Sequence, residues 1–254
     1  MKAIILAAGL CTRIRTLTQD KPKCLLELKG KTILQHQIDT FHSCNITDIS
    51  IVKGFKAEMI NIPGIKYYIN SNYKNNNILN SLLYAEDELN DDVVVSYSDI
   101  LFEKIILERL ISSKRNISIC ADVKWIENYH GRSQHPVEEA EKVVFDRENR
   151  VIEIGKILRQ KHDVYGEFIG LMKFTKEGCV VFKQKFYRAK TLFWGSPFQK
   201  ANTFEEAYLT DMIQHMVDLG VEVYCVIIEG GWIEIDTIQD LEMAERKNLE
   251  WTIV

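Results

Sequence analysis

An apolar run at residues 3–8 (Ala-Ile-Ile-Leu-Ala-Ala) is the feature that most constrains the fold of this chain. A short, uninterrupted apolar segment is typical of a strand buried on both faces of a parallel sheet. Gly9 ends the run, and a residue without a side chain lets the backbone turn tightly against a ligand. Four cations follow in one loop: Arg13, Arg15, Lys21 and Lys23. A strand, a glycine turn and nearby cations together indicate an α/β protein that binds nucleotide phosphates.

Segments with strand-like and helix-like patterns alternate after this loop. Apolar residues at helical spacing predict helices at residues 33–41, 77–89 and 101–111. Short apolar runs predict strands at residues 48–52, 65–69, 93–95 and 117–123. Such alternation predicts a Rossmann-like three-layer α/β sandwich, in which a mostly parallel mixed sheet carries helices on both faces.

The second half of the chain changes character. Residues 125–141 are polar and contain Gly131 and Pro136, which predicts a mobile loop near the active site. An inserted hairpin is expected at residues 143–145 and 151–154. We then expect a strand at 166–174, a helix at 205–219, a strand at 221–228 and a closing helix at 237–249. We expect a single domain over residues 1–254, with a nucleotide-binding half at about 1–123 and an acceptor-binding part at about 124–236.

Composition excludes several classes of protein. The chain has 254 residues, is 46% hydrophobic and 27% charged, and these values are ordinary for a soluble enzyme. Its net charge of -4 argues against bulk nucleic-acid binding. Six scattered cysteines without a C-x-x-C pair indicate reduced thiols, and no apolar stretch approaches a membrane span. We therefore expect a cytoplasmic protein. It could form a homo-oligomer, and the sequence does not determine the oligomeric state.

The N-terminal motif resembles the signature of nucleotidyltransferases that activate sugar phosphates and small phosphorylated alcohols or phosphonates. The motif consists of Leu6, Ala7, Ala8, Gly9, Thr12 and Arg13, followed by Lys21, Pro22 and Lys23. One position departs from the pattern, because Cys11 stands where the family usually has a second glycine. The resemblance covers nearly the whole chain and implies that this motif binds a nucleoside triphosphate. Arg13 and Lys23 would brace its phosphates, whereas the alternative is a solvated basic loop.

Two aspartates are candidates for a metal site. Asp99 follows the strand at 93–95, and Asp236 precedes the closing helix. The resemblance implies that they share one Mg²⁺, and Mg²⁺ prefers carboxylate and phosphate oxygens. The alternatives are a turn residue at Asp99 and a helix cap at Asp236. Ser98 stands where metal-dependent glycosyltransferases commonly have the first aspartate of an Asp-x-Asp pair, which favours nucleotidyl transfer over sugar transfer.

A second resemblance concerns the nucleotide. Residues 76–81 (Asn-Asn-Ile-Leu-Asn-Ser) resemble a segment that lies near the nucleotide in choline-phosphate and phosphonate cytidylyltransferases. Asn77 and Ser81, together with Ser98, are therefore expected to contact the nucleotide, since an amide can both donate to and accept from a pyrimidine edge. The alternative is that Asn76 or Asn77 caps the following helix, and both roles can be shared between the pair.

The acceptor site is expected in the second half of the chain. Lys156 follows the predicted hairpin and matches the family's acceptor-phosphate lysine, with Lys142 as its rival. Glu167, Trp232 and Glu234 could form an acidic and aromatic pocket that suits an amine or a quaternary ammonium group. Core packing is the alternative for Trp232. Two further residues of the polar segment, Arg132 and His135, could instead bind an anionic acceptor.

The resemblance implies a cytidylyltransferase that joins CMP from CTP to a small phosphorylated or phosphonate acceptor and releases pyrophosphate. Phosphocholine and 2-aminoethylphosphonate are the first expected acceptors, with a phosphorylated amino acid or similar small molecule as a further candidate, in surface polysaccharide or phosphonate biosynthesis. Arg13, Lys23 and Lys156 would neutralise charge with Mg²⁺, and no general base is required because a phosphomonoester's second pKa is about 6. The alternatives are a hexose-1-phosphate uridylyl- or thymidylyltransferase, a catalytically silent nucleotide-binding subunit, and a glycosyltransferase.

Overall fold

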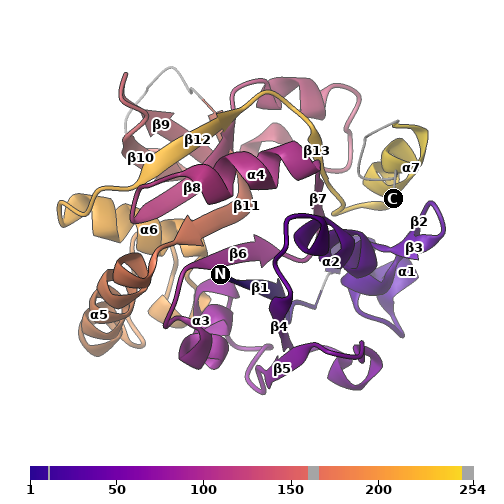
Figure 1. Ribbon diagram of the computed structural model, residues 1–254, viewed down its shortest axis with the longest axis horizontal. Helices are drawn as coiled ribbons and strands as arrows, with labels where there is room; N and C mark the ends of the chain where they lie inside the picture. The colour runs from indigo at the N-terminus through magenta and orange to yellow at the C-terminus, as the bar shows by residue number, and fades with distance from the viewer. Residues whose placement is uncertain (11, 160–165, 248–254) are drawn as a thin grey trace.

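A nine-stranded mixed sheet forms the centre of the computed structural model, which describes residues 1–10, 12–159 and 166–247 (Figure 1). The order is β10-β9-β11-β6-β1-β4-β5, and β8 and β12 branch from β11. Only β10 and β11 run against the direction of the other strands. The strands are β1 (Lys2–Ala7), β4 (Asp48–Lys53), β5 (Lys66–Ile69), β6 (Val93–Tyr97), β8 (Ile117–Asp122), β9 (Lys142–Phe145), β10 (Val151–Gly155), β11 (Gly166–Phe174) and β12 (Tyr224–Ile228). This architecture confirms the predicted fold class.

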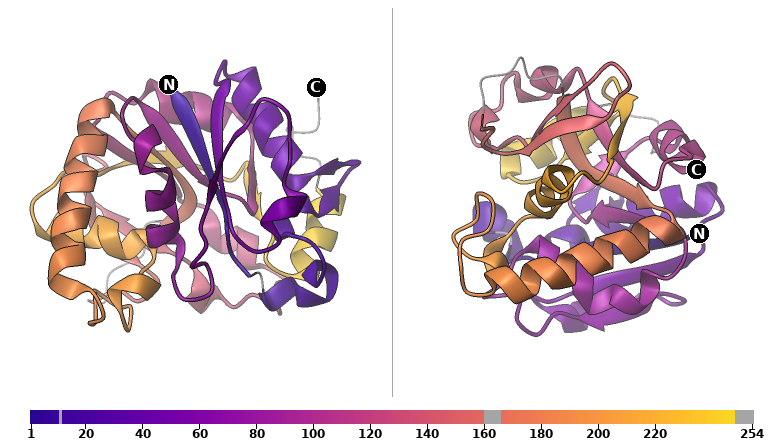
Figure 2. Two further views of the ribbon diagram at one scale, coloured as in Figure 1. Left: turned by 90° about the horizontal axis from the view of Figure 1, so that it is seen from below. Right: turned by 90° about the vertical axis from the view of Figure 1, so that its left-hand side faces the viewer.

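Helices cover both faces of the sheet, and α2 and α5 lie on opposite sides of the strands in Figure 2. Apolar side chains of α3, α5 and α6 pack into the core on one face, and those of α2 and α4 pack into the core on the other. The helices are α1 (Arg15–Thr18), α2 (Ile33–Ser43), α3 (Ile78–Leu82), α4 (Lys104–Ser112), α5 (Lys176–Phe193), α6 (Leu209–Asp218) and α7 (Ile238–Arg246). None of the helices in the described ranges is long and apolar enough to cross a bilayer.

Strand β1 lies in the middle of the sheet, as the apolar run predicts. It pairs in parallel with β4 on one side and β6 on the other, and Leu6 lies opposite both Val52 and Tyr97. Parallel strands end at the same edge of a sheet, where open α/β sheets bind ligands. The turn at Gly9 and the residue Asp99 therefore follow neighbouring strands at one edge.

A short two-stranded ribbon beside the main sheet brings distant parts of the chain together. Strand β7 (Ile100–Phe102) pairs antiparallel with β13 (Trp232–Glu234), so that Ile100 lies opposite Glu234. The Ile235 N–H donates to the Asp99 carbonyl at 2.8 Å. The prediction of a helix from residue 101 was wrong here, because residues 100–102 form β7 and α4 begins at Lys104. The other small ribbon joins β2 (Glu27–Leu28) to β3 (Lys31–Thr32).

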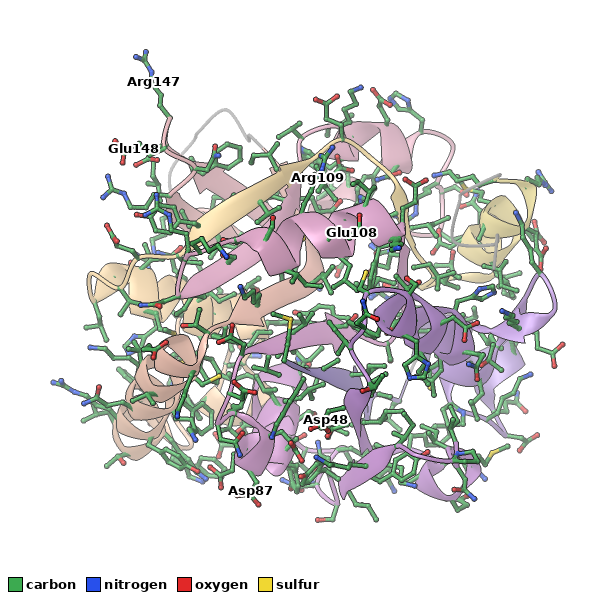
Figure 3. The ribbon with its side chains drawn as sticks, viewed as in Figure 1. Asp48, Asp87, Glu108, Arg109, Arg147 and Glu148 are labelled. Atoms are coloured by element: carbon green, nitrogen blue, oxygen red, sulfur yellow. The ribbon has the colours of Figure 1, made fainter. Side chains whose placement is uncertain are left out.

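Other boundaries in the second half differ from the predictions. The helix expected at 205–219 is a 3₁₀ turn followed by α6, and the strand expected at 221–228 begins only at Tyr224. Helix α5 was not predicted, because its many lysines mask buried positions at helical spacing: Cys179, Phe182, Phe186 and Ala189. The inserted hairpin is confirmed as β9 and β10, and Figure 3 shows Arg147 and Glu148 pointing outward from its turn.

The polar segment at residues 125–141 contains local structure. It forms 3₁₀ turns at Trp125–Tyr129 and Val137–Glu139, and His135 between them is buried. This segment is called the acceptor segment below. Its sequence predicts a loop, and the structure adds two turns and a buried histidine to that expectation.

We predict that Gly54→Ala destabilises the fold through the end of β1. A Cβ at position 54 would lie 2.7 Å from the Ala8 carbonyl oxygen and 2.8 Å from Tyr73 Cβ. Overpacking of this kind should lower the free energy of unfolding by about 1–3 kcal/mol in urea denaturation. Gly9→Ala is the control, because a Cβ there meets no described atom within 4 Å, and its change should stay within about 0.5 kcal/mol. Equal stabilities of the two variants would contradict this account.

Candidate active site

A buried lysine joins the two candidate metal ligands. Lys23 begins the 3₁₀ turn Lys23–Leu25 directly after Pro22, and only 5% of its surface is exposed. Its Nζ lies 2.5 Å from Asp99 Oδ2 and 2.5 Å from Asp236 Oδ1. Three of the residues predicted for the site, from widely separated parts of the chain, therefore meet at the sheet edge.

The ribbon of β7 and β13 explains how the two aspartates become neighbours. Asp99 precedes β7, Asp236 follows β13 by two residues, and the antiparallel pairing aligns these ends. The alternative role predicted for Asp236 was a cap on the closing helix, but the next residue, Thr237, is the cap. The Thr237 hydroxyl accepts a hydrogen bond from the Asp240 N–H at 3.2 Å, within a capping box. The Asp236 side chain is thus left for the site.

Arg13 adds a second cation beside Asp236. Its Nη2 lies 2.6 Å from Asp236 Oδ2, and its Nη1 lies 4.0 Å from Glu139 Oε2. Burial would raise the pKa of Asp236, but Lys23 and Arg13 outweigh burial and hold it well below its ordinary value. Burial, reinforced by Asp236 and Asp99, raises the pKa of Glu234 well above its ordinary value. Asp236 is therefore an anion at any physiological pH.

The oxygens of this pair fit a divalent cation. Asp99 Oδ1 and Asp236 Oδ2 are buried and accept no hydrogen bond from the described residues; Arg13 approaches the second without hydrogen-bond alignment. Carboxylate oxygens are the hard ligands that Mg²⁺ prefers. Ligand atoms of His135, Glu234 and Asp236 also lie within 4.8 Å of one another, but His135 Nδ1 is 2.9 Å from Arg132 Nη2. Asp99 and Asp236 are the better match to Mg²⁺.

A cavity of about 150 Å³ opens beside these residues. Its carboxylates are Asp99, Glu139, Glu141, Glu167, Glu234 and Asp236. Its aromatic residues are Tyr97, Phe168, Tyr208 and Trp232. Its cations are Arg13 and Lys156, because burial and Arg132 lower the pKa of His135 to about 4 and leave that imidazole neutral. The lining combines two cations with an excess of carboxylates and aromatic rings.

The structure distinguishes the two candidate lysines. Lys156 lines the cavity, where its Nζ lies 2.8 Å from Glu139 Oε2 and 4.4 Å from the centre of the Tyr208 ring. Lys142 Nζ donates instead to three backbone carbonyls, those of Glu138, Ala140 and Lys156. Those bonds tie the acceptor segment to β10, so the geometry favours Lys156 as the anion-binding lysine.

Glu167 lines the cavity and has one carboxyl oxygen without a hydrogen-bond partner among the described residues. Tyr129 donates to its Oε1 at 2.6 Å, while its buried Oε2 accepts no hydrogen bond from the described residues. Burial raises the pKa of Glu167 to about 8. The carboxyl group is therefore mostly neutral at pH 7, and a cation placed against it would favour ionisation.

Trp232 serves both as core and as cavity wall. It is buried in the core beneath α4, and it also lines the cavity. Its Nε1 donates to Asp122 Oδ2 at 2.7 Å, and Asp122 Oδ1 accepts the N–H groups of Lys124 and Gly230. Asp122 therefore fixes the ring, a role that the sequence analysis missed because only the folded chain brings residues 122 and 232 together.

The predicted nucleotide-binding residues lie at or near the same edge. Leu6, Ala7 and Ala8 are buried at the end of β1, and Gly9 follows them on the surface. Ser98 is half-buried between β6 and β7. Cys11 lies outside the described residues, and Thr12 is described only as the first residue of the 3₁₀ turn Thr12–Ile14. The nucleotide roles of these residues stay predictions.

The asparagine segment has structural partners. Asn77 lines the cavity and caps α3, since its Oδ1 accepts the Ile78 N–H at 2.8 Å. Ser81 is buried, accepts from Asn70 Nδ2 at 2.9 Å and donates to the Asn77 carbonyl. The capping alternative therefore holds for Asn77, and Ser81 is placed among protein partners rather than in the cavity lining.

Comparisons with known proteins agree with this fold and site. The chain belongs to the family described as the MobA-like NTP transferase domain, whose model matches residues 3–159. It is a nucleotidyltransferase, as the N-terminal motif predicts. It is 30% identical to CTP:phosphoglutamine cytidylyltransferase from Campylobacter jejuni, over 97% of this chain and 100% of that protein.

Two further proteins are similar over different lengths. Choline-phosphate cytidylyltransferase from Streptococcus pneumoniae is 33% identical over 44% of this chain and 51% of its own length. The solved structure of CTP:phosphocholine cytidylyltransferase from Streptococcus pneumoniae superposes with a TM-score of 0.71 at 22% identity, covering 96% of this chain and 97% of that one. This structural likeness shows the shared fold.

We predict that Lys23→Ala lowers turnover by at least about tenfold, because it leaves Asp99 and Asp236 facing each other without the cation between them. Pyrophosphate release measures the effect, and circular dichroism checks that the fold is kept. Lys31→Ala, which removes an exposed ion pair with Asp39, is the control, and its rate should stay within about twofold. Near-normal turnover in Lys23→Ala would refute the assignment of Lys23.

Proposed function

We propose that the protein is a CTP-dependent cytidylyltransferase whose acceptor carries a phosphate or phosphonate group and, elsewhere in the molecule, an amine. The observation that carries this proposal is the composition of the cavity: Arg13 and Lys156 suit an anion, whereas Glu167, Glu234 and Trp232 suit a cation. The cytidylyltransferases among its relatives supply the choice of CTP.

The nucleotide would bind at the carboxyl end of β1. Gly9 leaves room for the triphosphate, and Arg13 and Lys23 neutralise its charge. Asp99 and Asp236 would hold Mg²⁺, which supplies further positive charge at the phosphates when it is bound. Lys23 also compensates these two carboxylates, so its charge serves the protein and the nucleotide together.

The acceptor would supply the attacking oxygen. An anionic oxygen of its phosphate or phosphonate forms a bond to the α-phosphorus of CTP, the bond to the β-phosphate oxygen breaks, and pyrophosphate leaves. The acceptor already carries the needed charge near neutral pH, so no side chain has to remove a proton. Lys156 would release Glu139, bind the acceptor's phosphate or phosphonate group in its place, and so orient that group.

A phosphorylated amino acid or its amide is the first acceptor to test. A relative that matches 97% of this chain is named for phosphoglutamine, and such a molecule carries an ammonium group for Glu167. Phosphocholine and 2-aminoethylphosphonate share the pairing of an anionic and a cationic end. A hexose phosphate lacks the cation and would leave the buried carboxyl groups of the cavity without a partner.

We also propose that the reaction takes place in the cytoplasm. Among the described residues, the cysteines are free thiols: Cys24, Cys44, Cys120, Cys179 and Cys225. Free thiols of this number are typical of a reducing compartment. A CMP-activated product would then serve surface polysaccharide or phosphonate biosynthesis.

Pyrophosphate release tests the proposed function. The purified protein is incubated with Mg²⁺ and each of CTP, UTP, dTTP and ATP, combined with phosphorylated glutamine, phosphocholine, 2-aminoethylphosphonate and glucose 1-phosphate. We expect release with CTP and an amine-bearing acceptor. Release with a hexose phosphate in place of the amine-bearing acceptors would contradict the interpretation of Glu167 and Trp232. No release from any pair, despite tight CTP binding, would favour the silent nucleotide-binding subunit.

Acceptor binding is predicted to release a proton from Glu167. Because its pKa is about 8, this group is protonated in about nine-tenths of molecules at pH 7, and a bound ammonium group lowers that pKa. Acceptor affinity should therefore rise as the pH increases towards 8 and then level off. Calorimetry at pH 7 in two buffers with different ionisation enthalpies measures the proton release.

Two glutamine variants separate this effect from general charge loss. Glu167→Gln should weaken acceptor binding and abolish the proton release. Glu138→Gln removes an exposed carboxylate of the acceptor segment and should leave both unchanged. A heat of acceptor binding that is independent of the buffer in the unmodified protein would rule out this role for Glu167.

A further inference from the structure

The first turn of α7 holds the acceptor segment against the site. Gln239 Oε1 accepts the backbone N–H of Ser133 at 2.8 Å and that of Gln134 at 3.2 Å. Its Nε2 donates to the Gly131 carbonyl at 2.7 Å. One side chain of the closing helix therefore binds the backbone of the acceptor segment at three positions, and the next residue, Asp240, extends this contact to the metal-binding side.

The Asp240 carboxylate joins the two halves of the site. It is 1% exposed, and its Oδ2 accepts the backbone N–H groups of Asp236 at 3.0 Å and Thr237 at 2.8 Å. Its Oδ1 accepts from Arg132 Nε at 2.7 Å. One buried group thus fixes the backbone of a candidate metal ligand and, at the same time, a side chain of the acceptor segment.

Arg132 carries the connection to the cavity. Its side chain is only 5% exposed, and its Nη2 lies 2.9 Å from Nδ1 of His135, which lines the cavity. The Arg132 guanidinium also lies over the ring of Tyr129, whose hydroxyl donates to Glu167. A continuous set of buried polar contacts therefore runs from the acceptor cavity to the backbone of Asp236.

We propose that Asp240 and Arg132 are positioning residues that couple the acceptor segment to the metal carboxylate Asp236. This inference rests on the proposed function, because it takes Asp236 to hold Mg²⁺ with the nucleotide. Neither Asp240 nor Arg132 is among the described residues that line the cavity, so both act through other groups.

The physical basis of the coupling is the cost of separating a buried ion pair. Moving the acceptor segment away from α7 would carry Arg132 out of its site and leave the Asp240 carboxylate without its buried cation, which is strongly unfavourable. A ligand that orders Asp236 should therefore also order residues 131–135. Linkage requires the reverse as well, so that an acceptor ordering this segment strengthens metal binding by the same factor.

Hydrogen–deuterium exchange with Mg²⁺ and CTP, without acceptor, tests the coupling directly. In the unmodified protein, Mg²⁺ with CTP should slow exchange at least about threefold in peptides covering residues 3–9 and in those covering residues 130–136. Arg132→Lys keeps the charge but loses the fork that reaches both Asp240 and His135. Its peptides at residues 3–9 should still be protected, whereas those at residues 130–136 should show no change on adding Mg²⁺ and CTP.

Controls separate coupling from folding and from the proposed function. Arg150→Lys alters an exposed ion pair with Asp146 and should behave as the unmodified protein does. Asp240→Asn should repeat the result of Arg132→Lys; if it does not fold, Arg132→Lys carries the test alone. Protection of residues 130–136 that survives in Arg132→Lys would overturn the inference. Protection of residues 3–9 alone in the unmodified protein would also overturn the inference. If Mg²⁺ and CTP slow exchange in neither region of the unmodified protein, the proposed function itself is overturned.

Discussion

The contact of Lys23 with Asp99 and Asp236 is the interaction on which the rest of the site depends. The carboxylates of Asp99 and Asp236 repel each other, and a cation between them offsets that repulsion. Lys23 supplies that cation at 2.5 Å from both, and Arg13 adds a second charge beside Asp236. The sheet edge can therefore hold two anionic candidate metal ligands. The antiparallel pairing of β7 with β13 places Asp99 and Asp236 next to each other there.

The acceptor cavity continues this balance of charge. Its two cations are already paired with carboxylates, Arg13 with Asp236 and Lys156 with Glu139, so an anionic group enters by exchange rather than by filling an uncompensated positive site. The buried Glu167 has the opposite need, because its Oε2 accepts no hydrogen bond from the described residues and a cationic ligand would supply a partner. A small molecule with an anionic and a cationic end satisfies both conditions, whereas a hexose phosphate satisfies only the first.

The sequence predicted those parts of the molecule that local patterns determine. The apolar run of β1, the turn at Gly9 and the place of Asp99 after β6 follow from strand patterns and from the common edge of parallel strands. The pairing of Asp99 with Asp236 came only from the family resemblance, since no local signal joins residues 137 positions apart. Asp122 and Asp240 were missed for the same reason: each acts through tertiary hydrogen bonds. Strand β7 was mistaken for helix because a three-residue apolar strand next to an amphipathic helix carries no distinct period.

Anomalous diffraction from crystals grown with Mn²⁺ and a non-hydrolysable CTP analogue tests the central claim most directly. The account predicts a manganese peak bound by Asp99 and Asp236 and by the phosphates of the nucleotide, with Lys23 still beside the two carboxylates. A peak bound by His135 and Glu234 without Asp99, or a nucleotide bound away from the Gly9 turn, would contradict it.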